Sequence, residues 1–404
     1  MRILIVPHIG ETLGHVVMGL AIADELSRRG ADVEIAAARR GFDLISGWSQ
    51  RYVFHPIRWD WSHNSCDAAG ESESFYARVC LSVQDVADVV RHRRPDLLVG
   101  LPGFATTQVA RHYHVPHASI LHGPHLSPIV SLDNPDSSER AILKLGDRFC
   151  KTYMAKGFEI VSERFGFSGL DYDEYLDSET IFVPQPGLKL KAPAGLREVP
   201  FIGGSFGPVR RESELLPHGT CYVTFGTGNP CDISRVVELA AEVFPTVLVT
   251  VGNHRLRPMP SNVIVNDFVA ISSLAGGPAA VINHGGIGVV GVFANSGTPQ
   301  LIIPTELDQA TMAVHARRLG IADACGLRVW ETRFVLGRRM PQLDDEEILV
   351  ALRALAARGT TNRFPSCNGA SEIADQILSQ GTTSRPHELG HAAQRQPVGV
   401  QEAF

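Results

Sequence analysis

Cysteine is sparse and unpaired in this sequence of 404 residues. The seven cysteines are scattered along the chain, and no two of them form a Cys-x-x-Cys pair. Their odd number and wide spacing argue against a disulfide framework and are typical of buried or free thiols in a reducing compartment.

Long hydrophobic runs are also absent. No stretch approaches the roughly 20 apolar residues that a membrane span requires. The chain opens MRILIVPHIG, where one arginine precedes an apolar run that ends at Pro7, and this run is too short for the core of a signal peptide. We therefore expect a soluble cytoplasmic protein without a membrane span.

An excess of positive charge is missing as well. The formal net charge is −6 and neither half of the chain has a strong basic surplus, which argues against binding to nucleic acid. Hydrophobic residues make up 44% and charged residues 20%, an ordinary globular mixture. The length exceeds that of one compact core, so two domains are expected.

Short apolar runs alternate with helical periodicity in both halves of the chain. The expected strands cover residues 2–7, 31–38, 95–100 and 117–121, then 221–228, 246–252, 262–267, 279–286 and 299–305. Residues 14–30 have helical spacing and close on basic residues and Gly30. This rhythm predicts an α/β fold with parallel sheets and helices on both faces.

The alternation divides the chain into two Rossmann-like domains. We place the first at residues 1–203, a Gly- and Pro-rich linker at 204–217 and the second domain at 218–380. The polar tail, 381–404, is expected to be disordered. Two stretches, 60–80 and 131–149, interrupt the first domain as apparent insertions where a partner molecule could be recognised.

The tail contains HELGH (387–391), which matches the zinc-protease signature. That chemistry requires both histidines on one face of a buried helix. Here the run follows Pro386 and contains a glycine, so we predict no metal site.

His15 is the first candidate catalytic residue. It follows the first strand and begins a helix, at the edge of the sheet where ligands bind in open parallel sheets. The positive end of the helix dipole disfavours imidazolium, which keeps a general base neutral. The alternative is that His15 caps the helix or packs between domains.

Two glycine turns follow strands in the second half, FGTG (225–228) and NHGGIG (283–288). Glycines allow backbone N–H groups to approach an anion, and a following helix adds its dipole, so these turns and His284 could hold a phosphate. Tight strand-to-helix turns are the alternative.

Asp308 and Gln309 follow a later strand and could bind vicinal hydroxyls, or Asp308 could cap its helix.

In order and content these stretches resemble a known family. Residues 14–37, 222–228 and 263–322 are similar to nucleotide-sugar-dependent glycosyltransferases of the GT-B architecture, and the nearest branch is the bacterial natural-product enzymes of the UDP-glycosyltransferase group. The resemblance implies an α/β fold in which two Rossmann-like parallel-sheet domains face an interdomain cleft.

The resemblance also implies roles, residue by residue. His15 would be the catalytic base that deprotonates the acceptor. The donor would be held by Gly226, Thr227, His284, Gly285, Gly286 and Gly288 at the diphosphate, by Phe268 and Val269 at the base, and by Asp308 and Gln309 at the sugar hydroxyls. The reaction would be an inverting displacement, with no metal and no cofactor besides the TDP-sugar or UDP-sugar donor.

The sequence departs from the family at several positions. Leu101 occupies the place of the Asp that usually orients the base, and Glu11, His122, His125 or another nearby group remain open as substitutes. Ile287, Val289 and Val292 stand where polar residues often contact phosphate or ribose. Backbone groups would then replace side-chain hydrogen bonds worth about 1.5–3 kcal/mol each.

We therefore predict a glycosyltransferase that moves a sugar to a hydroxyl of a small-molecule natural product, as in antibiotic biosynthesis. The acceptor, the donor base and the oligomeric state, including a homodimer, remain open. A catalytically silent binding or activating partner is the alternative function. An oxidoreductase is disfavoured because GETLGH lacks the GxGxxG spacing. Acceptor-side aromatics are Phe54, Trp59, Trp61, Phe75 and Tyr76, each of which could equally belong to the core.

Overall fold

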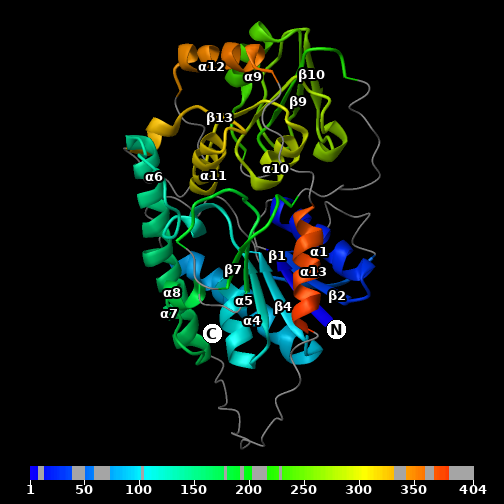
Figure 1. The fold of residues 1–404 in the computed structure, drawn as a ribbon, viewed down its shortest axis with the longest axis vertical. Helices are drawn as coiled ribbons and strands as arrows, with labels where there is room; N and C mark the ends of the chain where they lie inside the picture. The colour runs from blue at the N-terminus through cyan, green and yellow to red at the C-terminus, as the bar shows by residue number, and fades with distance from the viewer. Residues whose placement is uncertain are drawn as a thin grey trace, which may run out of the picture.

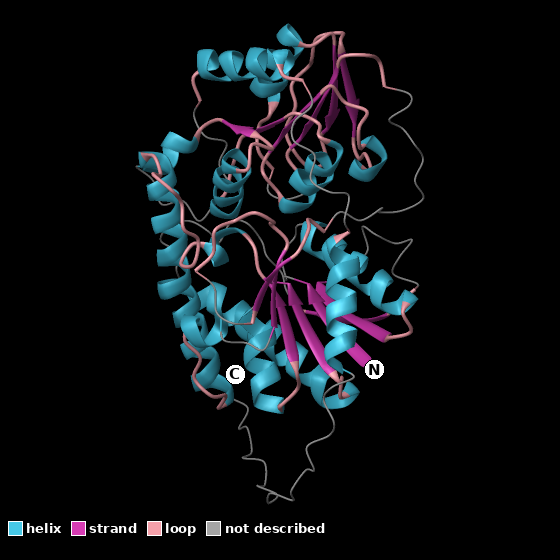
Figure 2. Cartoon of the chain, viewed as in Figure 1, coloured by secondary structure: helices cyan, strands magenta, loops and turns pink. Residues whose placement is uncertain are grey.

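The protein, described here from a computed structural model, contains two parallel β-sheets, one in each half of the chain (Figures 1 and 2). The structure describes residues 1–7, 13–38, 51–58, 73–101, 104–176, 180–191, 195–202, 216–226, 230–331, 343–359 and 368–381. Helices lie on both faces of each sheet (Figure 2). The predicted α/β class is thus confirmed.

The sheet of the N-terminal half has seven strands in the order β3-β2-β1-β4-β5-β6-β7. Its strands are β1 (Arg2–Pro7), β2 (Asp32–Ala38), β3 (Val53–Ile57), β4 (Leu97–Leu101), β5 (His117–Ile120), β6 (Thr180–Val183) and β7 (Leu196–Glu198). All pairs are parallel, and Pro7 is level with Leu101. The order reverses between β1 and β4, which is the switch point where such sheets bind ligands.

The helices of this half are α1 (Leu13–Arg28), α4 (Glu73–Arg93), α5 (Phe104–Tyr113), α6 (Ser137–Arg148), α7 (Ala155–Phe165) and α8 (Tyr172–Leu176), with a 3-10 helix η2 (Gly123–Leu126) and a π-helix η3 (Phe149–Met154). The expected helix at 14–30 corresponds to α1, and Gly30 follows it with a φ of 88°. Helix α6 begins with a capping box between Asp136 and Glu139.

The sheet of the C-terminal half has six parallel strands in the order β10-β9-β8-β11-β12-β13. They are β8 (Thr220–Thr224), β9 (Thr246–Thr250), β10 (Val263–Asn266), β11 (Ala280–Asn283), β12 (Gln300–Ile302) and β13 (Asp323–Ala324). The order reverses between β8 and β11, where Thr224 is level with Asn283. Both glycine turns predicted from the sequence therefore begin side by side at this switch point.

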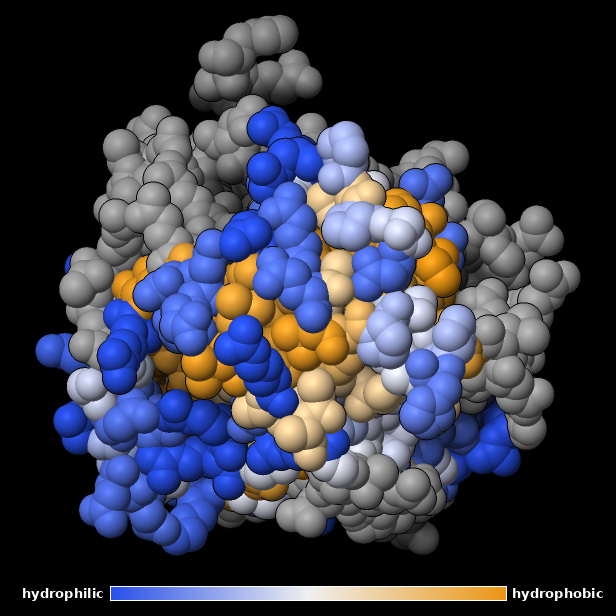
Figure 3. Space-filling view, turned by 90° about the horizontal axis from the view of Figure 1, so that it is seen from above, coloured by the Kyte–Doolittle hydropathy of each residue, from blue (hydrophilic) through white to orange (hydrophobic). Residues whose placement is uncertain are grey.

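Five α- and 3-10 helices follow strands of this sheet, and two further helices end the described chain. The first group is α9 (Ser234–Val243), η5 (Ile271–Leu274), α10 (Ile287–Ser296), α11 (Leu307–Arg318) and η6 (Leu327–Glu331), followed by α12 (Asp345–Ala357) and α13 (Gly369–Gly381). Hydrophobic and hydrophilic side chains are mixed on the outer end of this half, near α9 and α12 (Figure 3). Val350 of α12 is 56% exposed there.

The last described helix returns to the N-terminal half, where α13 packs beside α1 (Figure 1). Arg29, which follows α1, donates to Asp375 Oδ1 at 2.7 Å and to Ser371 Oγ at 2.7 Å. Ile373 and Ile377 of α13 belong to the same buried cluster as the apolar face of α1. The end of the second predicted domain is therefore physically attached to the first sheet.

The stretch 131–149, which the sequence analysis treated as an insertion, contains α6. This helix contacts α11 and η6 of the C-terminal half. Arg317 and Arg318 of α11 donate to the Glu139 carboxylate, which is 1% exposed. This segment of the N-terminal half therefore contacts the C-terminal half directly.

Several predictions fall outside the described residues. These are most of the interrupted region 60–80, nearly all of the linker 204–217 and, beyond Gly381, the tail with HELGH. In the part of the chain that is described, no helix is long and apolar enough to cross a membrane, and no three His, Cys, Asp or Glu side chains cluster as metal ligands. The structure contains one chain, so a homodimer stays a prediction.

Candidate active site

The two halves meet where the loops after β5 and β12 come together. Gly123, with a φ of 59°, turns its Cα toward Asp308 at the start of α11. A Cβ built on Gly123 would lie 3.4 Å from the Asp308 Cβ. The carboxyl-end loops of both sheets therefore share this contact, as expected of a ligand site in parallel α/β folds.

His15 lies in the first turn of α1 and contacts His122, the residue before Gly123. Their Nε2 atoms are 2.8 Å apart, and the rings stack with centroids 4.9 Å apart. The bond requires one Nε2 with a hydrogen and one without, so it excludes a pair of two imidazolium ions. His122 is 5% exposed, whereas His15 is half-buried.

This contact bears on the residue that orients His15. Leu101 is fully buried in the core and carries no polar group. Of the three alternatives left open by the sequence, Glu11 lies outside the described residues, and the His125 ring packs edge-on against Phe149, with centroids 5.8 Å apart. His122 is the alternative that the structure brings against His15.

Asn283, at the end of β11, builds the turn that follows it. Its Nδ2 donates to Gln300 Oε1 at 3.1 Å, and its Oδ1 accepts the Gly285 N–H at 2.8 Å. Gly285 has a φ of 93°, a left-handed conformation that favours glycine. In this geometry the Gly285 amide serves the turn itself, and its contact with a diphosphate stays a prediction.

The imidazole of His284 is packed between two glycines. A Cβ on Gly226 would lie 2.8 Å from His284 Cε1, and a Cβ on Gly286 would lie 2.7 Å from His284 Nε2. Either side chain would displace the ring, so both positions require glycine for close approach. The two predicted phosphate turns thus pack against the same side chain, the imidazole of His284. Thr227 lies outside the described residues.

Helix α10 starts at this cradle. Gly286 is its N-cap residue and Gly288 lies in its first turn, where backbone N–H groups have no partner within the helix. A Cβ on Gly288 would meet no atom within 4 Å. The first turn of α10 therefore offers amides and open space to an anion.

The apolar departures Ile287, Val289 and Val292 are packing residues. They are 8%, 6% and 7% exposed. Ile287 joins the large cluster that also contains α1, and Val289 packs with Tyr222 and Phe293. These positions of α10 therefore contribute to the core.

Asp308 and Gln309 differ in their surroundings. Asp308 is half-buried beside Gly123, and the N-cap of α11 is Glu306, so Asp308 does not cap the helix. The Gln309 Oε1 accepts from Thr305 N at 2.9 Å and from Thr305 Oγ1 at 2.8 Å. Gln309 thus stabilises its own turn, and its role at a sugar stays a prediction.

The residues predicted at the base and the acceptor are distributed as follows. Phe268 is 66% exposed after β10, whereas the neighbouring Val269 is buried. Phe54 packs partly buried against the core, and Tyr76 is buried at 9% exposure. Trp59, Trp61 and the side chain of Phe75 lie outside the described residues.

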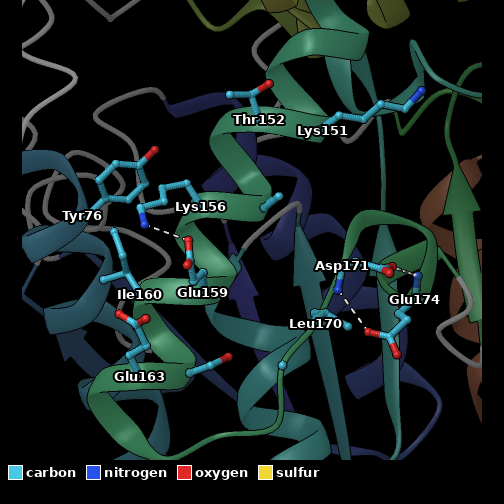
Figure 4. Close-up of a pocket in the computed structure, with 13 residues that line it drawn as sticks. Tyr76, Lys151, Thr152, Lys156, Glu159, Ile160, Glu163, Leu170, Asp171 and Glu174 are labelled. Carbon is cyan, nitrogen blue, oxygen red and sulfur yellow. Dashed lines mark hydrogen bonds and ion pairs between the residues drawn. The ribbon is translucent and has the colours of Figure 1, made fainter.

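A cavity of about 1160 Å³ lies elsewhere, along α7 and α8 (Figure 4). Its lining includes Tyr76 of α4 and neither His15 nor His284. Lys156 pairs with Glu159 at 2.7 Å, and Asp171 and Glu174 bond reciprocally. The charged groups in these pairs are compensated by their neighbours, so we assign the cavity no role in the site.

His254, which the sequence analysis did not single out, borders the same glycine turn as His284. Its Nε2 lies 3.0 Å from the Gly226 carbonyl oxygen. No sequence spacing links residue 254 to residue 226, because their proximity depends on β8 and β9 being neighbours.

Comparisons with known proteins bear on the fold. Residues 232–331 match the family described as erythromycin biosynthesis protein CIII-like, C-terminal domain. No curated protein sequence matches the chain. One similar solved structure is the glycotransferase of kitacinnamycin, with 18% identity, coverage of 94% of this chain and 98% of that chain, and a TM-score of 0.68. The calicheamicin glycosyltransferase CalG4 has 17% identity, coverage of 95% of this chain and 99% of its own, and a TM-score of 0.63. The spinosyn rhamnosyltransferase SpnG, complexed with thymidine diphosphate, has 17% identity, coverage of 95% of this chain and 96% of its own, and a TM-score of 0.60.

The chain has the GT-B fold. The resemblance to bacterial natural-product glycosyltransferases that the sequence predicted is confirmed. In this GT-B fold the N-terminal half supplies His15 and His122, and the C-terminal half supplies His284 and Asp308.

Proposed function

We propose that the protein is an inverting, metal-independent glycosyltransferase that moves a sugar from a TDP-sugar or UDP-sugar to a hydroxyl group of a small-molecule natural product. The observation that carries the proposal is the contact of the two halves: His122 holds His15 and is followed by Gly123, which faces Asp308. A proton acceptor and a candidate sugar ligand thus lie at the same junction.

In the proposed donor complex, the diphosphate lies at the first turn of α10. The amides of Gly286 and Gly288 and the imidazole of His284 donate to its oxygens, and the helix dipole favours its negative charge. Asp308 accepts hydrogen bonds from sugar hydroxyls. The similar SpnG structure is complexed with thymidine diphosphate, which supports a thymidine or uridine diphosphate donor here.

In the proposed reaction, the His15–His122 pair takes the proton from the acceptor hydroxyl. Two neutral imidazoles have two unprotonated nitrogens, of which one accepts the shared hydrogen bond, so the other can take one proton without loss of that bond. The acceptor oxygen forms a bond to the anomeric carbon, and the bond from this carbon to the diphosphate oxygen breaks, with inversion. The α10 dipole and His284 stabilise the charge of the leaving diphosphate.

A direct test is a thermal-shift panel of nucleotides and nucleotide sugars. A ligand that binds only the folded protein stabilises it by about 2.7 kcal/mol at a concentration of 100 times Kd. We expect thymidine or uridine diphosphates to raise the melting temperature, with and without chelator, and the corresponding monophosphates to raise it less. If no nucleoside diphosphate has an effect, the proposed donor is wrong.

The alternative, a catalytically silent partner, predicts binding without turnover. The His15–His122 bond argues against it, because a binding protein has no need for a paired imidazole at this junction. Product analysis after incubation with a donor and a panel of polyketide-type and phenolic acceptors distinguishes the two functions.

A further inference from the structure

His254 is a buried histidine close to the proposed donor site. It is 7% exposed and ends the turn after β9, where its own N–H donates to Val251 O at 2.9 Å. The next residue, Arg255, bonds to the Cys231 carbonyl at 2.9 Å. The backbone on both sides of the imidazole is therefore fixed by hydrogen bonds.

Both ring nitrogens of His254 bond to backbone groups near the glycine turn. Nδ1 lies 3.2 Å from the backbone N of Cys231 and 3.3 Å from the Sγ of the same residue, and Nε2 lies 3.0 Å from the Gly226 carbonyl oxygen. A backbone N–H only donates and a carbonyl only accepts. The imidazole is thus neutral, with its hydrogen on Nε2.

Gly226 lies between two histidines. Its carbonyl accepts from His254, and its Cα faces the His284 ring, where a Cβ would come within 2.8 Å. Gly226 has a φ of 75°, so its backbone is held in the left-handed region. Any shift of this peptide would change the space available to the His284 imidazole.

We infer that His254 is a positioning residue for donor binding: it holds the Gly226 peptide against His284 and so sets the shape of the diphosphate cradle. This inference rests on the proposed function. It assigns His254 no contact with the donor. Its effect is on affinity for the diphosphate, and the proton transfer at His15 is independent of it.

Two substitutions separate the two bonds of His254. Asn places an amide oxygen near the position of Nδ1 and cannot reach Gly226, whereas Gln can extend an amide N–H toward the Gly226 carbonyl. Because one hydrogen bond contributes about 0.5–1.5 kcal/mol, we expect His254→Asn to bind thymidine and uridine diphosphate about 3- to 10-fold more weakly. His254→Gln should remain within about threefold of wild type.

The experiment is titration calorimetry with thymidine and uridine diphosphate, together with steady-state kinetics. We expect His254→Asn to raise KM for the donor and leave kcat nearly unchanged. His117→Asn is a matched control, because His117 is also 7% exposed and bonds to Thr107 and Ser119 in the N-terminal half. It should lower the melting temperature without changing diphosphate affinity.

The outcomes distinguish the inference from the proposed function. If His254→Asn binds the diphosphate as tightly as wild type, or if His117→Asn weakens binding equally, the inference is wrong. Should His254→Asn not fold, a His254→Gln variant that binds about tenfold more weakly than wild type would also contradict it. If wild type binds neither diphosphate, the proposed function fails, and the inference with it.

Discussion

The Nε2 atoms of His15 and His122 lie 2.8 Å apart, although the strands that precede these residues are not neighbours in the sheet. Strand β4 lies between them and ends at Leu101. The carboxylate expected after β4 is absent, and an imidazole from the next strand occupies the contact with His15. The site thus pairs two imidazoles, where the family resemblance implies an imidazole and a carboxylate.

We predict that His122→Ala lowers kcat by about 10- to 100-fold and changes donor affinity little, because His15 loses the group that orients it. His122→Asp, which supplies a carboxylate, should recover part of the loss. The His15→Ala/His122→Ala double variant should be no slower than His15→Ala, since the two residues act as a unit. Additive losses in this cycle would show that they act separately.

His15→Ala should reduce transfer by about 10²- to 10⁴-fold, the usual contribution of a general base. Binding of thymidine or uridine diphosphate should be almost unchanged, because His15 lies in the N-terminal half and the proposed diphosphate cradle in the C-terminal half. Rates and calorimetric affinities of the same preparation test both parts. Turnover at the wild-type rate would exclude His15 as the base.

The cradle predicts a steric effect at Gly286. Its φ of −64° is acceptable to alanine, so Gly286→Ala acts through the Cβ alone, which would lie 2.7 Å from His284 Nε2. We expect about tenfold weaker binding of nucleoside diphosphate, comparable to His284→Ala. Gly169→Ala is the control, because its Cβ would meet no atom within 4 Å. If Gly286→Ala and wild type bind nucleoside diphosphate with equal affinity, His284 does not contribute to diphosphate binding.

The parts of the fold that could be predicted from the sequence are those with local causes. Continuous apolar runs such as 2–7 and 279–283 are buried strands. Gly285, with a φ of 93°, marks a turn whose backbone favours glycine. The confirmed GT-B fold follows from this rhythm and the family resemblance.

What the sequence could not show depends on which strands are neighbours. His122 and His254 contact His15 and Gly226 only because of the sheet order. Likewise, Asp308 and Gln309 are adjacent in sequence, yet Gln309 points into its own turn because Thr305 offers it two donors. No periodicity encodes such contacts.

The buried carboxylate of Glu139 joins the two halves and predicts a loss of stability. Burial raises the pKa of Glu139, but its hydrogen bonds to Arg318 and Arg317 outweigh this and leave the pKa lowered. Glu139→Gln removes the carboxylate charge that both arginines share, while Arg317 keeps its pair with Asp136. We expect it to lower the free energy of unfolding by about 1.5–3 kcal/mol, the usual contribution of a hydrogen bond to a charged group.

Denaturant unfolding measures this loss. Asp133→Asn is the control, because Asp133 and Lys189 form an exposed pair at 71% and 66% side-chain exposure, and exposed pairs contribute little. If both variants lose equal stability, Glu139 is not a buried link between the halves.

Two buried histidines predict how stability depends on pH. Burial lowers the pKa of His315 to about 4, and burial with the nearby Arg111 lowers that of His117 to about 4, from an ordinary 6.5. Gln185 Nε2, from the other half, lies 3.1 Å from His315 Nδ1, a bond that needs the neutral ring.

Between about pH 6.5 and 4 the unfolded chain therefore binds protons at these sites that the folded protein does not. Stability is fully present above pH 6.5 and falls as the pH drops through this window, by about 1.4 kcal/mol per pH unit for each histidine. Urea unfolding at pH 7, 5.5 and 4.5 should show the decline.

His315→Asn should be less stable than wild type at pH 7, because it leaves a cavity. It should lose less stability on acidification, since one of the two proton-binding sites is gone. Parallel pH profiles for this variant and wild type would mean that His315 does not cause the acid sensitivity.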